Sequence, residues 1–215
     1  MTVDTYSSSH KPHLMLEARA LTCIRGERQL FQNLNLTVMA GECLHVRGEN
    51  GIGKTSLLRL LTGLAKPEAG ELLWNQQSIS QNPSVYHREL LFLGHRDALK
   101  GDLTALENLQ LYAVLDGIQL PDDKALAALW RFGLRGRESL PVSCLSAGQK
   151  RRILMARMLT RQAKLWILDE PFNALDLHAV QDLQGLITEH VEQAGLVVLT
   201  SHQAVNLPQV RTLDL

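Results

Sequence analysis

A glycine-rich segment at residues 48–55 has the residue types and the spacing that bind phosphate groups. It reads Gly48, Glu49, Asn50, Gly51, Ile52, Gly53, Lys54 and Thr55, followed by Ser56, and it matches the pattern GxxxxGK[ST]. Glycines let successive backbone N–H groups point inward around an anion, and a helix that begins near Gly53 adds its positive end. We expect Lys54 to reach the β- and γ-phosphates and the Thr55 hydroxyl to bind Mg²⁺. The segment therefore predicts a nucleotide site.

Two acidic residues, Asp169 and Glu170, follow an apolar stretch at residues 165–168. An unbroken apolar run is typical of a parallel strand that is buried on both faces. Ligands of open α/β sheets lie at the carboxyl ends of such strands. We therefore expect Asp169 to reach Mg²⁺ through water. Glu170 is the candidate for orienting or deprotonating a water that attacks the γ-phosphate.

Both segments need a scaffold that brings strand ends together, and the chain alternates strand and helix patterns from Leu14 onward. Apolar patterns predict strands at residues 34–38, 42–47, 90–93, 164–168 and 196–200. Helical spacing predicts helices at residues 57–61, 146–161 and 177–193. These elements predict an α/β fold with a mainly parallel central sheet, in which residues 196–200 are the last clear strand. We also expect an N-terminal antiparallel β part.

The stretch from residue 96 to residue 145 has helical patterns and no strand pattern. A helix follows Thr104, which fits a capping box with Glu107, and a second helix is expected at residues 122–132. We therefore place a small helical insert at about residues 96–145, inside one domain that spans residues 14–215. Residues 1–13 are polar and predict a flexible N-terminal tail, with Met1 and Met15 both open as the native start.

The composition argues against several classes of protein. Of the 215 residues 45% are hydrophobic, and 22 lysines and arginines balance 22 acidic residues. A general nucleic-acid-binding surface usually has a basic excess, and no run approaches the roughly 18 apolar residues of a membrane span. The N-terminus lacks the apolar region of a secretory signal, so we expect a cytosolic chain. Cys23, Cys43 and Cys144 form no CxxC pair, and we expect three buried or half-buried thiols.

A third peptide, at residues 145–149, reads Leu-Ser-Ala-Gly-Gln and resembles the signature of ATP-binding cassette proteins, which is usually LSGGQ. Ser146 and Gln149 fit a capping box, so the peptide begins a helix whose N-terminus is an anion site. In that family the signature contacts the γ-phosphate bound by the other subunit of a head-to-tail dimer. The resemblance implies that Ser146, Ala147, Gly148 and Gln149 complete the ATP site of a second copy.

Further residues look like elements of the same family, with two departures. Asp176 looks like the D-loop aspartate, and His202 looks like the switch histidine that senses the γ-phosphate. The family usually places Gln before the helical insert, where this chain has His95. His95 either replaces the Gln contact to Mg²⁺ and the attacking water or is a structural histidine. The aromatic residue that usually stacks on adenine is absent, and Arg25 falls near that place, where its guanidinium is able to stack on the ring.

Together these motifs resemble the ATP-binding subunit of the haem exporter complex in the bacterial cytochrome c maturation system. The resemblance rests on His95 after Gly94, residues 103–109, residues 145–149 and residues 55–59. It implies an ATPase that uses ATP and Mg²⁺, pairs with a second copy, and acts on integral membrane subunits at the cytoplasmic face of the inner membrane, without nucleic acid. The implied docking place is a groove near residues 95–102.

The work that hydrolysis powers is open at this stage. The resemblance allows haem export, and it also allows the release of a haem-loaded chaperone from the membrane complex. The same motifs serve the ATPase subunit of a different ABC permease, and they serve an ATP-gated assembly factor that transports nothing. A P-loop GTPase is disfavoured because the chain has no NKxD-type guanine motif.

Overall fold

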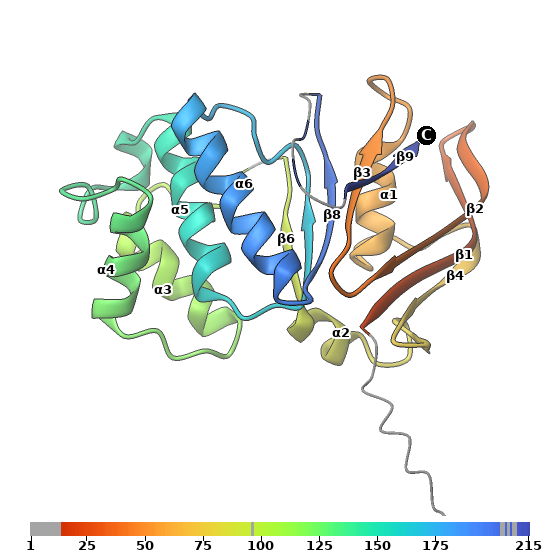
Figure 1. Ribbon diagram of the computed structural model, residues 1–215, viewed down its shortest axis with the longest axis horizontal. Helices are drawn as coiled ribbons and strands as arrows, with labels where there is room; N and C mark the ends of the chain where they lie inside the picture. Colours follow the sequence, from red (N-terminus) through yellow and green to blue (C-terminus); the bar gives the residue numbers. More distant parts are fainter. Residues whose placement is uncertain (1–13, 96, 203–204, 206, 208–209) are drawn as a thin grey trace, which may run out of the picture.

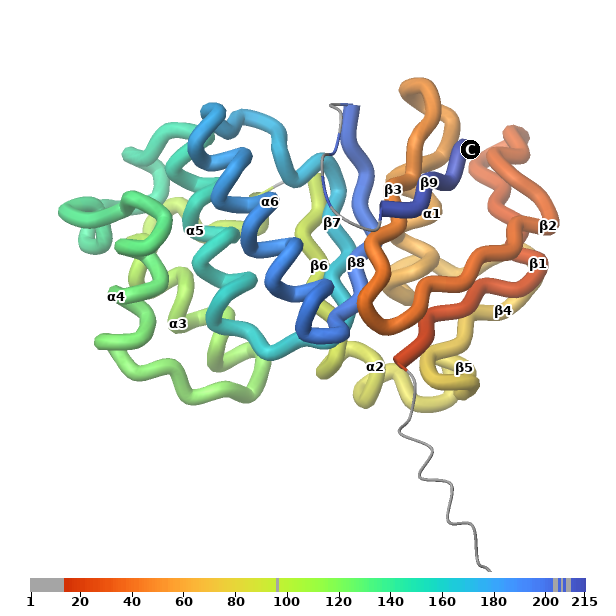
Figure 2. The backbone as a smooth tube through the Cα atoms, in the orientation of Figure 1, coloured from red at the N-terminus to blue at the C-terminus, as the bar shows by residue number. Residues whose placement is uncertain are grey.

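The chain folds around a central parallel sheet with helices on both faces and a second, antiparallel sheet on one side (Figure 1). The computed structural model describes residues 14–95, 97–202, 205, 207 and 210–215, so the predicted tail at residues 1–13 lies outside the described residues. Figure 2 shows the helices α5 and α6 on one side of the central sheet and α1 on the other, next to the antiparallel sheet. The α/β fold class predicted from the sequence is confirmed.

The central sheet has five parallel strands. In spatial order they are β6 (Leu90–Leu93), β7 (Leu165–Leu168), β8 (Leu196–Thr200), β3 (Cys43–Arg47) and β9 (Val210–Asp214). Every residue of β7 and β8 is buried. For this reason β7 is an unbroken apolar run, and β8 is apolar up to its last residue, Thr200. Because β8 lies between β7 and β3, the carboxyl ends of these three strands meet at one edge of the sheet.

Alternate residues of the central sheet pack into two separate cores. On one face Trp166 and Val197 pack into the core that includes α5 (Ala147–Thr160) and α6 (Leu177–Glu192). On the other face Ile167 and Val198 pack into the core that includes α1 (Lys54–Leu61). Burying each large aliphatic side chain contributes about 1.5–3 kcal/mol. The two cores hold the strand ends in fixed positions relative to both groups of helices.

The second sheet is antiparallel and covers α1. Its order is β2 (Arg28–Met39), β1 (Met15–Arg25), β4 (Ala69–Trp74) and β5 (Gln77–Ser78). β1 and β2 form a long hairpin with Arg25 opposite Arg28 at its tip. The inward residues Leu16, Leu21 and Val38 are fully buried in the same core as α1. This sheet therefore presents the start of β2 to the loop that precedes α1.

Besides α5, three α-helices of the described chain come between β4 and β7 in the sequence. α2 (Pro83–Glu89) leads into β6, and α3 (Ala105–Leu115) and α4 (Asp122–Arg131) follow β6 and pack against α5. The predicted capping box of α3 is confirmed: the Glu107 N–H donates to the Thr104 hydroxyl over 3.1 Å, and the Thr104 N–H donates to the Glu107 carboxylate over 2.8 Å. These hydrogen bonds hold the pKa of Glu107 below its ordinary value. The division into a domain and an insert stays a prediction.

The structure also corrects the sequence analysis at several places. β4, β5 and α2 were not predicted, and residues 196–200 are not the last strand, because β9 follows them at the edge of the sheet. β9 is only half-buried, so its sequence lacks the apolar run of an inner strand. Cys23 and Cys43 are buried as expected, and burial raises the pKa of Cys43 to about 12. Cys144 is exposed, because it ends the short 3₁₀ helix η1 (Val142–Cys144) at the surface.

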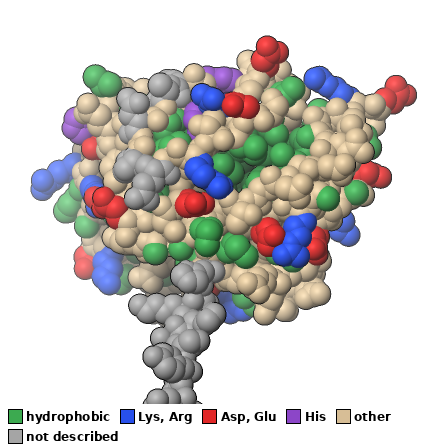
Figure 3. Space-filling view, turned by 45° about the vertical axis from the view of Figure 1, so that its right-hand side comes forward, with side chains coloured by type: hydrophobic (Ala, Val, Ile, Leu, Met, Phe, Trp, Pro, Cys, Tyr) green, Lys and Arg blue, Asp and Glu red, His purple; other side chains and the backbone are tan. Residues whose placement is uncertain are grey.

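The surface agrees with the balanced composition. On the face drawn in Figure 3, acidic and basic side chains are interspersed, and hydrophobic side chains gather between them. Within the residues that the structure describes, no helix is both long enough and apolar enough to cross a membrane.

Candidate nucleotide-binding site

In the loop between β3 and α1, the Ile52 N–H donates to the Glu49 oxygen over 3.3 Å, and the N–H groups at the start of α1 lack a side-chain cap among the described residues. Gly53, the residue before α1, has φ 128°. A Cβ at Gly53 would lie 3.2 Å from the Cβ of Leu30, so a larger residue is disfavoured by both conformation and space. The first N–H groups of a helix need a partner from outside the helix. An anion such as a phosphate is suited to this place.

Lys54 supplies the positive charge of the loop. Its Nζ donates to the backbone oxygens of Gly48 at 2.7 Å and Glu49 at 3.2 Å, so the side chain folds back over the loop. The residue is only 8% exposed. Two carbonyl partners fix the ammonium group and leave it one further N–H. The remaining donor and the net charge are available to a phosphate in the cavity.

A chain of hydrogen bonds joins the three strand ends. The Thr55 hydroxyl, at the start of α1, donates to Asp169 Oδ2 over 2.9 Å. The Thr200 hydroxyl, at the end of β8, donates to the other oxygen of Asp169 over 2.8 Å. The strand order β7–β8–β3 explains the arrangement, since Thr200 ends the strand that lies between the other two. The structure thus brings together the hydroxyl and the carboxylate that the sequence analysis assigns to Mg²⁺.

These oxygen atoms fit a magnesium ion chemically. Mg²⁺ prefers oxygen ligands, and it is usually bound through one or two protein groups together with water and phosphate oxygens. The Thr55 hydroxyl and the Asp169 carboxylate are such groups, and they lie within 2.9 Å of each other. When bound, the ion neutralises part of the negative charge of the phosphates. The assignment of Mg²⁺ to these two residues is a prediction.

Glu170 is held in an unusual backbone conformation. Its φ is 51°, in the left-handed region that non-glycine residues rarely adopt. Its N–H donates to the Thr200 hydroxyl over 2.9 Å, and one of its carboxylate oxygens accepts from the His202 N–H over 3.2 Å. The other oxygen, Oε1, is buried and lies 3.3 Å from His202 Nε2. The carboxylate therefore faces the side chain that the family resemblance identifies as the switch histidine.

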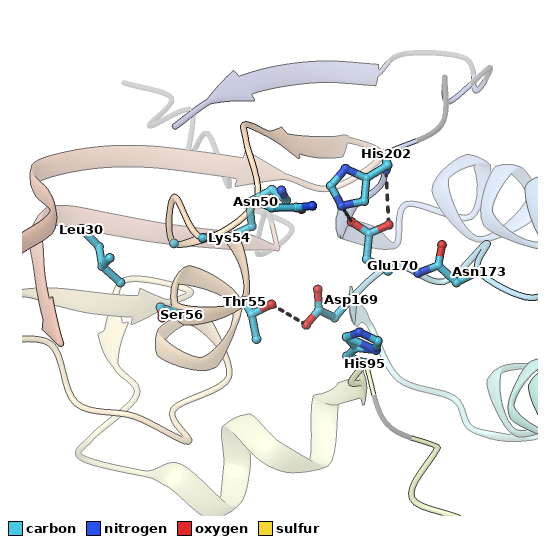
Figure 4. Close-up of a pocket in the computed structure, with 12 residues that line it drawn as sticks. Leu30, Asn50, Lys54, Thr55, Ser56, His95, Asp169, Glu170, Asn173 and His202 are labelled. Carbon is cyan, nitrogen blue, oxygen red and sulfur yellow. Dashed lines mark hydrogen bonds and ion pairs between the residues drawn. The ribbon is translucent and has the colours of Figure 1, made fainter. Parts of the chain in front are cut away.

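A cavity of about 460 Å³ collects these residues. Figure 4 shows Thr55 and Asp169 joined at its centre, with the Glu170–His202 pair on one side and His95 beside Asp169. The lining residues are Leu30, Asn50, Gly51, Gly53, Lys54, Thr55, Ser56, His95, Asp169, Glu170, Asn173 and His202. Leu30 and Asn173 were not singled out from the sequence. Leu30 comes from β2 of the other sheet, and only its position next to Gly53 reveals it.

Of two further predicted site residues, His95 lines the cavity and Arg25 does not. His95 lines the cavity, so it is placed to contact a nucleotide, and both hypotheses for its role stand. Arg25 ends β1 at the hairpin tip, is exposed, and does not line the cavity in the described structure. Contact between Arg25 and adenine stays a prediction.

A third histidine, His45 on β3, lies close to the segment that holds His202. Its Nε2 is 3.2 Å from the backbone oxygen of Ser201, the residue before His202. Burial lowers the pKa of His45.

The signature peptide is separate from this cavity. The Gln149 N–H donates to the Ser146 hydroxyl over 3.2 Å and the Gln149 side chain accepts from the Ser146 N–H over 3.0 Å, which confirms the predicted capping box. A Cβ at Gly148 would lie 2.9 Å from the Ala174 oxygen, so only glycine allows this close approach. Ala147 begins α5. None of these residues lines the cavity of the described chain.

The D-loop aspartate is fixed by α5 and α6 together. The Asp176 carboxylate accepts from the Ala179 N–H over 2.8 Å and from Arg152 over 2.7 Å. The Ala179 hydrogen bond, followed by that of Arg152, lowers the pKa of Asp176. Because Arg152 lies on the helix that begins at the signature, the signature and the D-loop are positioned as one unit.

Comparison with known proteins agrees with the fold and the site. The profile of the family described as ABC transporter matches residues 31–173. The chain therefore belongs to the ABC transporter family and is an ABC-type ATPase. Within this family it groups with the cytochrome c biogenesis ATP-binding export proteins called CcmA. It is 50% identical to that of Dechloromonas aromatica (90% of this chain, 95% of the relative) and 50% to that of Escherichia coli K12 (91% and 92%).

Solved structures support the fold. An ABC transporter ATP-binding protein of Pyrococcus furiosus matches with a TM-score of 0.81 and 24% identity, covering 94% of this chain and 97% of the other. A dimeric ATP-binding cassette, MJ0796 bound to ADP and phosphate, matches with a TM-score of 0.77 and 24% identity, covering 87% and 88%. At these identities the likeness concerns the fold alone.

Proposed function

We propose that this chain is the ATP-hydrolysing subunit of a membrane ABC complex for cytochrome c biogenesis. The observation that carries the ATPase part is the hydrogen-bonded chain from Thr55 through Asp169 and Thr200 to Glu170, which ends at His202 beside the phosphate loop. The identity of about 50% to proteins named for cytochrome c biogenesis and export supports the assignment to that complex.

Each group of the site has a proposed role in hydrolysis. The open N–H groups of the 48–55 loop and Lys54 bind the phosphates, and Thr55 and Asp169 hold Mg²⁺. Glu170 accepts a proton from the attacking water, or orients that water, because its Oε1 has spare capacity as an acceptor. His202 contacts the γ-phosphate and is released from Glu170 when it does so. His95 completes the cavity on the side of the helical insert.

The signature peptide acts on a second copy. Its capped helix start does not line the nucleotide cavity of the described chain, yet the Ser146 hydroxyl can still donate while it accepts from Gln149. Two chains arranged head to tail therefore bind two ATP molecules, each between Lys54 of one chain and Ser146 of the other. ATP binding closes the pair and hydrolysis opens it. The complex lies at the cytoplasmic face of the bacterial inner membrane, where integral membrane subunits dock near residues 95–102.

Glu170→Gln tests the role of the carboxylate. The amide cannot accept a proton, so phosphate release is expected to fall at least about 100-fold, within the usual range for a lost general base, while ATP binding is retained. Phosphate release and nucleotide binding are both measured. Glu68→Gln, an exposed carboxylate on the loop before β4, is the matched control and keeps wild-type turnover. Near-normal phosphate release by Glu170→Gln contradicts the general-base assignment.

Ser146→Arg tests the shared site. A bulky cation at the signature prevents closure of the pair, so hydrolysis is expected to stop while each chain still binds ATP. A filter-binding assay with ATP and a phosphate-release assay separate these two effects. Loss of ATP binding in this variant argues against the head-to-tail arrangement.

Purification from native membranes tests the biological assignment. The Glu170→Gln chain is recovered with ATP present, and the proteins that come with it are identified by mass spectrometry. Haem-handling membrane proteins of cytochrome c maturation are the expected partners, and their recovery supports the cytochrome c assignment while haem export and release of a haem-loaded chaperone both stay open. Recovery of an unrelated permease, or of assembly factors without a transport function, retains the ATPase and contradicts the cytochrome c assignment.

A further inference from the structure

Arg151 is a buried arginine that joins three parts of the molecule. It lies on α5, five residues after Ser146, and its side chain is only 7% exposed. Its guanidinium contacts the backbone of Glu170 and the carboxylate of Asp97. A buried guanidinium needs partners for its charge and its N–H groups. Asp97 balances the charge as an ion pair at Nη1, although Nη1 makes no hydrogen bond within the described residues. Both partners here belong to segments that border the nucleotide cavity.

The contact with Glu170 completes the hold on that residue. Arg151 Nη2 donates to the backbone oxygen of Glu170 over 3.2 Å, and the Glu170 N–H donates to the Thr200 hydroxyl over 2.9 Å. The peptide groups on both sides of the Glu170 Cα are thus fixed. A left-handed residue other than glycine persists only when its surroundings hold it there. The Glu170 backbone oxygen also accepts from the Asn173 N–H over 3.3 Å, so removing Arg151 leaves the peptide group after Glu170 with this single, longer hydrogen bond.

The contact with Asp97 connects this hold to the segment after His95. Arg151 Nη1 lies 3.2 Å from Asp97 Oδ1. The next residue, Ala98, is also fastened, because its oxygen accepts from the Tyr112 hydroxyl over 2.5 Å. The Tyr112 ring in turn lies under the Arg157 guanidinium of α5, 3.9 Å from the ring centre. Two successive residues of this segment are therefore tied, directly or through one side chain, to α5.

We propose that Arg151 is a positioning residue for Glu170 and that Asp97 sets the place of Arg151. A shift of the segment after His95 moves Asp97, releases the guanidinium, and lets the Glu170 peptide leave its left-handed conformation. The carboxylate then loses its alignment with the attacking water. This inference rests on the proposed role of Glu170 in hydrolysis. It adds a physical route by which the docking segment controls turnover.

The test compares kcat and KM for ATP hydrolysis, nucleotide affinity and melting temperature in the full chain. Arg151→Gln is expected to lower kcat about tenfold or more, because small misplacements of a reacting group have effects of this size. KM and nucleotide affinity change less than about twofold, because Arg151 does not line the cavity. Arg151→Lys retains one of the two contacts and gives an intermediate kcat.

Asp97→Asn tests the second half of the proposal. It keeps the shape of the side chain and removes its charge, and kcat is expected to fall about threefold, within the usual range of such couplings. In the Arg151→Gln background the same change has no further effect, because the two residues act through one contact. If the Arg151→Gln variant unfolds below the assay temperature, the Asp97→Asn variant alone tests the proposal. A wild-type kcat in Asp97→Asn then overturns the proposal.

Arg161→Gln is the matched control for the loss of a buried arginine. Arg161 follows α5, pairs with Asp116 at the end of α3, and donates to the backbone oxygens of His87 in α2 and Leu90 in β6 over 2.8 and 2.6 Å, so these partners are separate from Glu170. Its loss is expected to lower the melting temperature and leave kcat within about twofold. An equal fall of kcat in both variants, parallel to melting temperature, overturns the inference. A wild-type chain without ATPase activity contradicts the proposed function instead.

Discussion

The two edges of the central sheet are built from the same strands and have opposite characters. At the carboxyl edge, Gly48 follows β3, Asp169 follows β7 and Thr200 ends β8; Asp169 lines the nucleotide cavity and accepts from the Thr200 hydroxyl. At the amino edge, Trp166 is stacked on the His190 ring with centroids 3.7 Å apart and planes 2° apart. One edge keeps polar groups available to a ligand, and at the other two aromatic rings pack against each other beside a second cavity of about 500 Å³, which Trp166, His190 and Gly195 line.

The glycines at the two edges show what this difference requires. Gly48 at the carboxyl edge has φ 145°, so glycine is needed there for the backbone conformation. Gly195 at the amino edge is needed for packing, since a Cβ would lie 2.3 Å from His190 Nε2. Glu170, at the carboxyl edge, has a left-handed backbone conformation although it is not a glycine. We therefore expect changes at the amino edge to affect stability and changes at the carboxyl edge to affect nucleotide chemistry.

Trp166→Ala is expected to have the largest effect. It removes a side chain that is 3% exposed and leaves the His190 ring without its partner, which lowers the free energy of unfolding by about 3–5 kcal/mol. Urea unfolding followed by circular dichroism measures the change. The KM for ATP of the chain that remains folded is expected to match the wild type. A loss below about 1 kcal/mol would remove the distinction between the edges.

Lys54→Ala is the corresponding change at the carboxyl edge. We expect ATP affinity to fall at least about 100-fold, equivalent to about 2.7 kcal/mol, because the ammonium group is the main positive charge of the loop. The free energy of unfolding is expected to change by less than about 1 kcal/mol. Fluorescent-nucleotide titration gives the affinity and urea unfolding gives the stability. A large stability loss with ordinary ATP binding contradicts the comparison.

The pH dependence of stability sharpens the description of the amino edge. Burial lowers the pKa of His190 to about 4, from an ordinary value of 6.5. Between these values the unfolded chain binds a proton that the folded chain does not, so stability rises with pH across this window. The contribution is complete above pH 6.5 and is lost as the pH falls toward about 4. We expect the free energy of unfolding to fall by about 3 kcal/mol as the pH decreases from 6.5 to about 4, because each pKa unit corresponds to about 1.4 kcal/mol.

His190→Phe is the control, because it keeps an aromatic ring against Trp166 and does not titrate. The difference in unfolding free energy between the wild type and this variant isolates the His190 contribution from the other groups that titrate in the same range. If the free energy of unfolding depends on pH in the same way in both chains, the prediction that folding lowers the proton affinity of His190 is wrong.

Ser146→Ala is expected to have the smallest main effect of these changes. The start of α5 faces the ligand side but is closed by its own capping box, in contrast to the uncapped start of α1. Losing a serine cap lowers stability by about 1 kcal/mol. Urea unfolding detects this loss. No loss in Ser146→Ala means that the cap does not hold the start of α5.

The sequence predicts most of the carboxyl edge and little of the amino edge. Lys54, Thr55, Asp169 and Glu170 follow from local patterns, because strand ends and loop glycines are local features. Leu30, Asn173 and Arg151 depend on which distant segments meet, and a single sequence has no local signal for that. The only hint of Arg151 is an extra arginine beside Arg152 after the signature. The His190–Trp166 stack likewise joins residues of different elements.

The left-handed backbone of Glu170 has a consequence for the evolution and redesign of this chain. A glycine at this position would relieve a strain of about 1–3 kcal/mol, so the chain without its proposed base is expected to outlast the natural one on heating. Selection for thermal persistence alone therefore favours variants that no longer turn over ATP. Stabilised versions of this chain have to be selected with turnover as a second criterion, because at position 170 the two properties oppose each other.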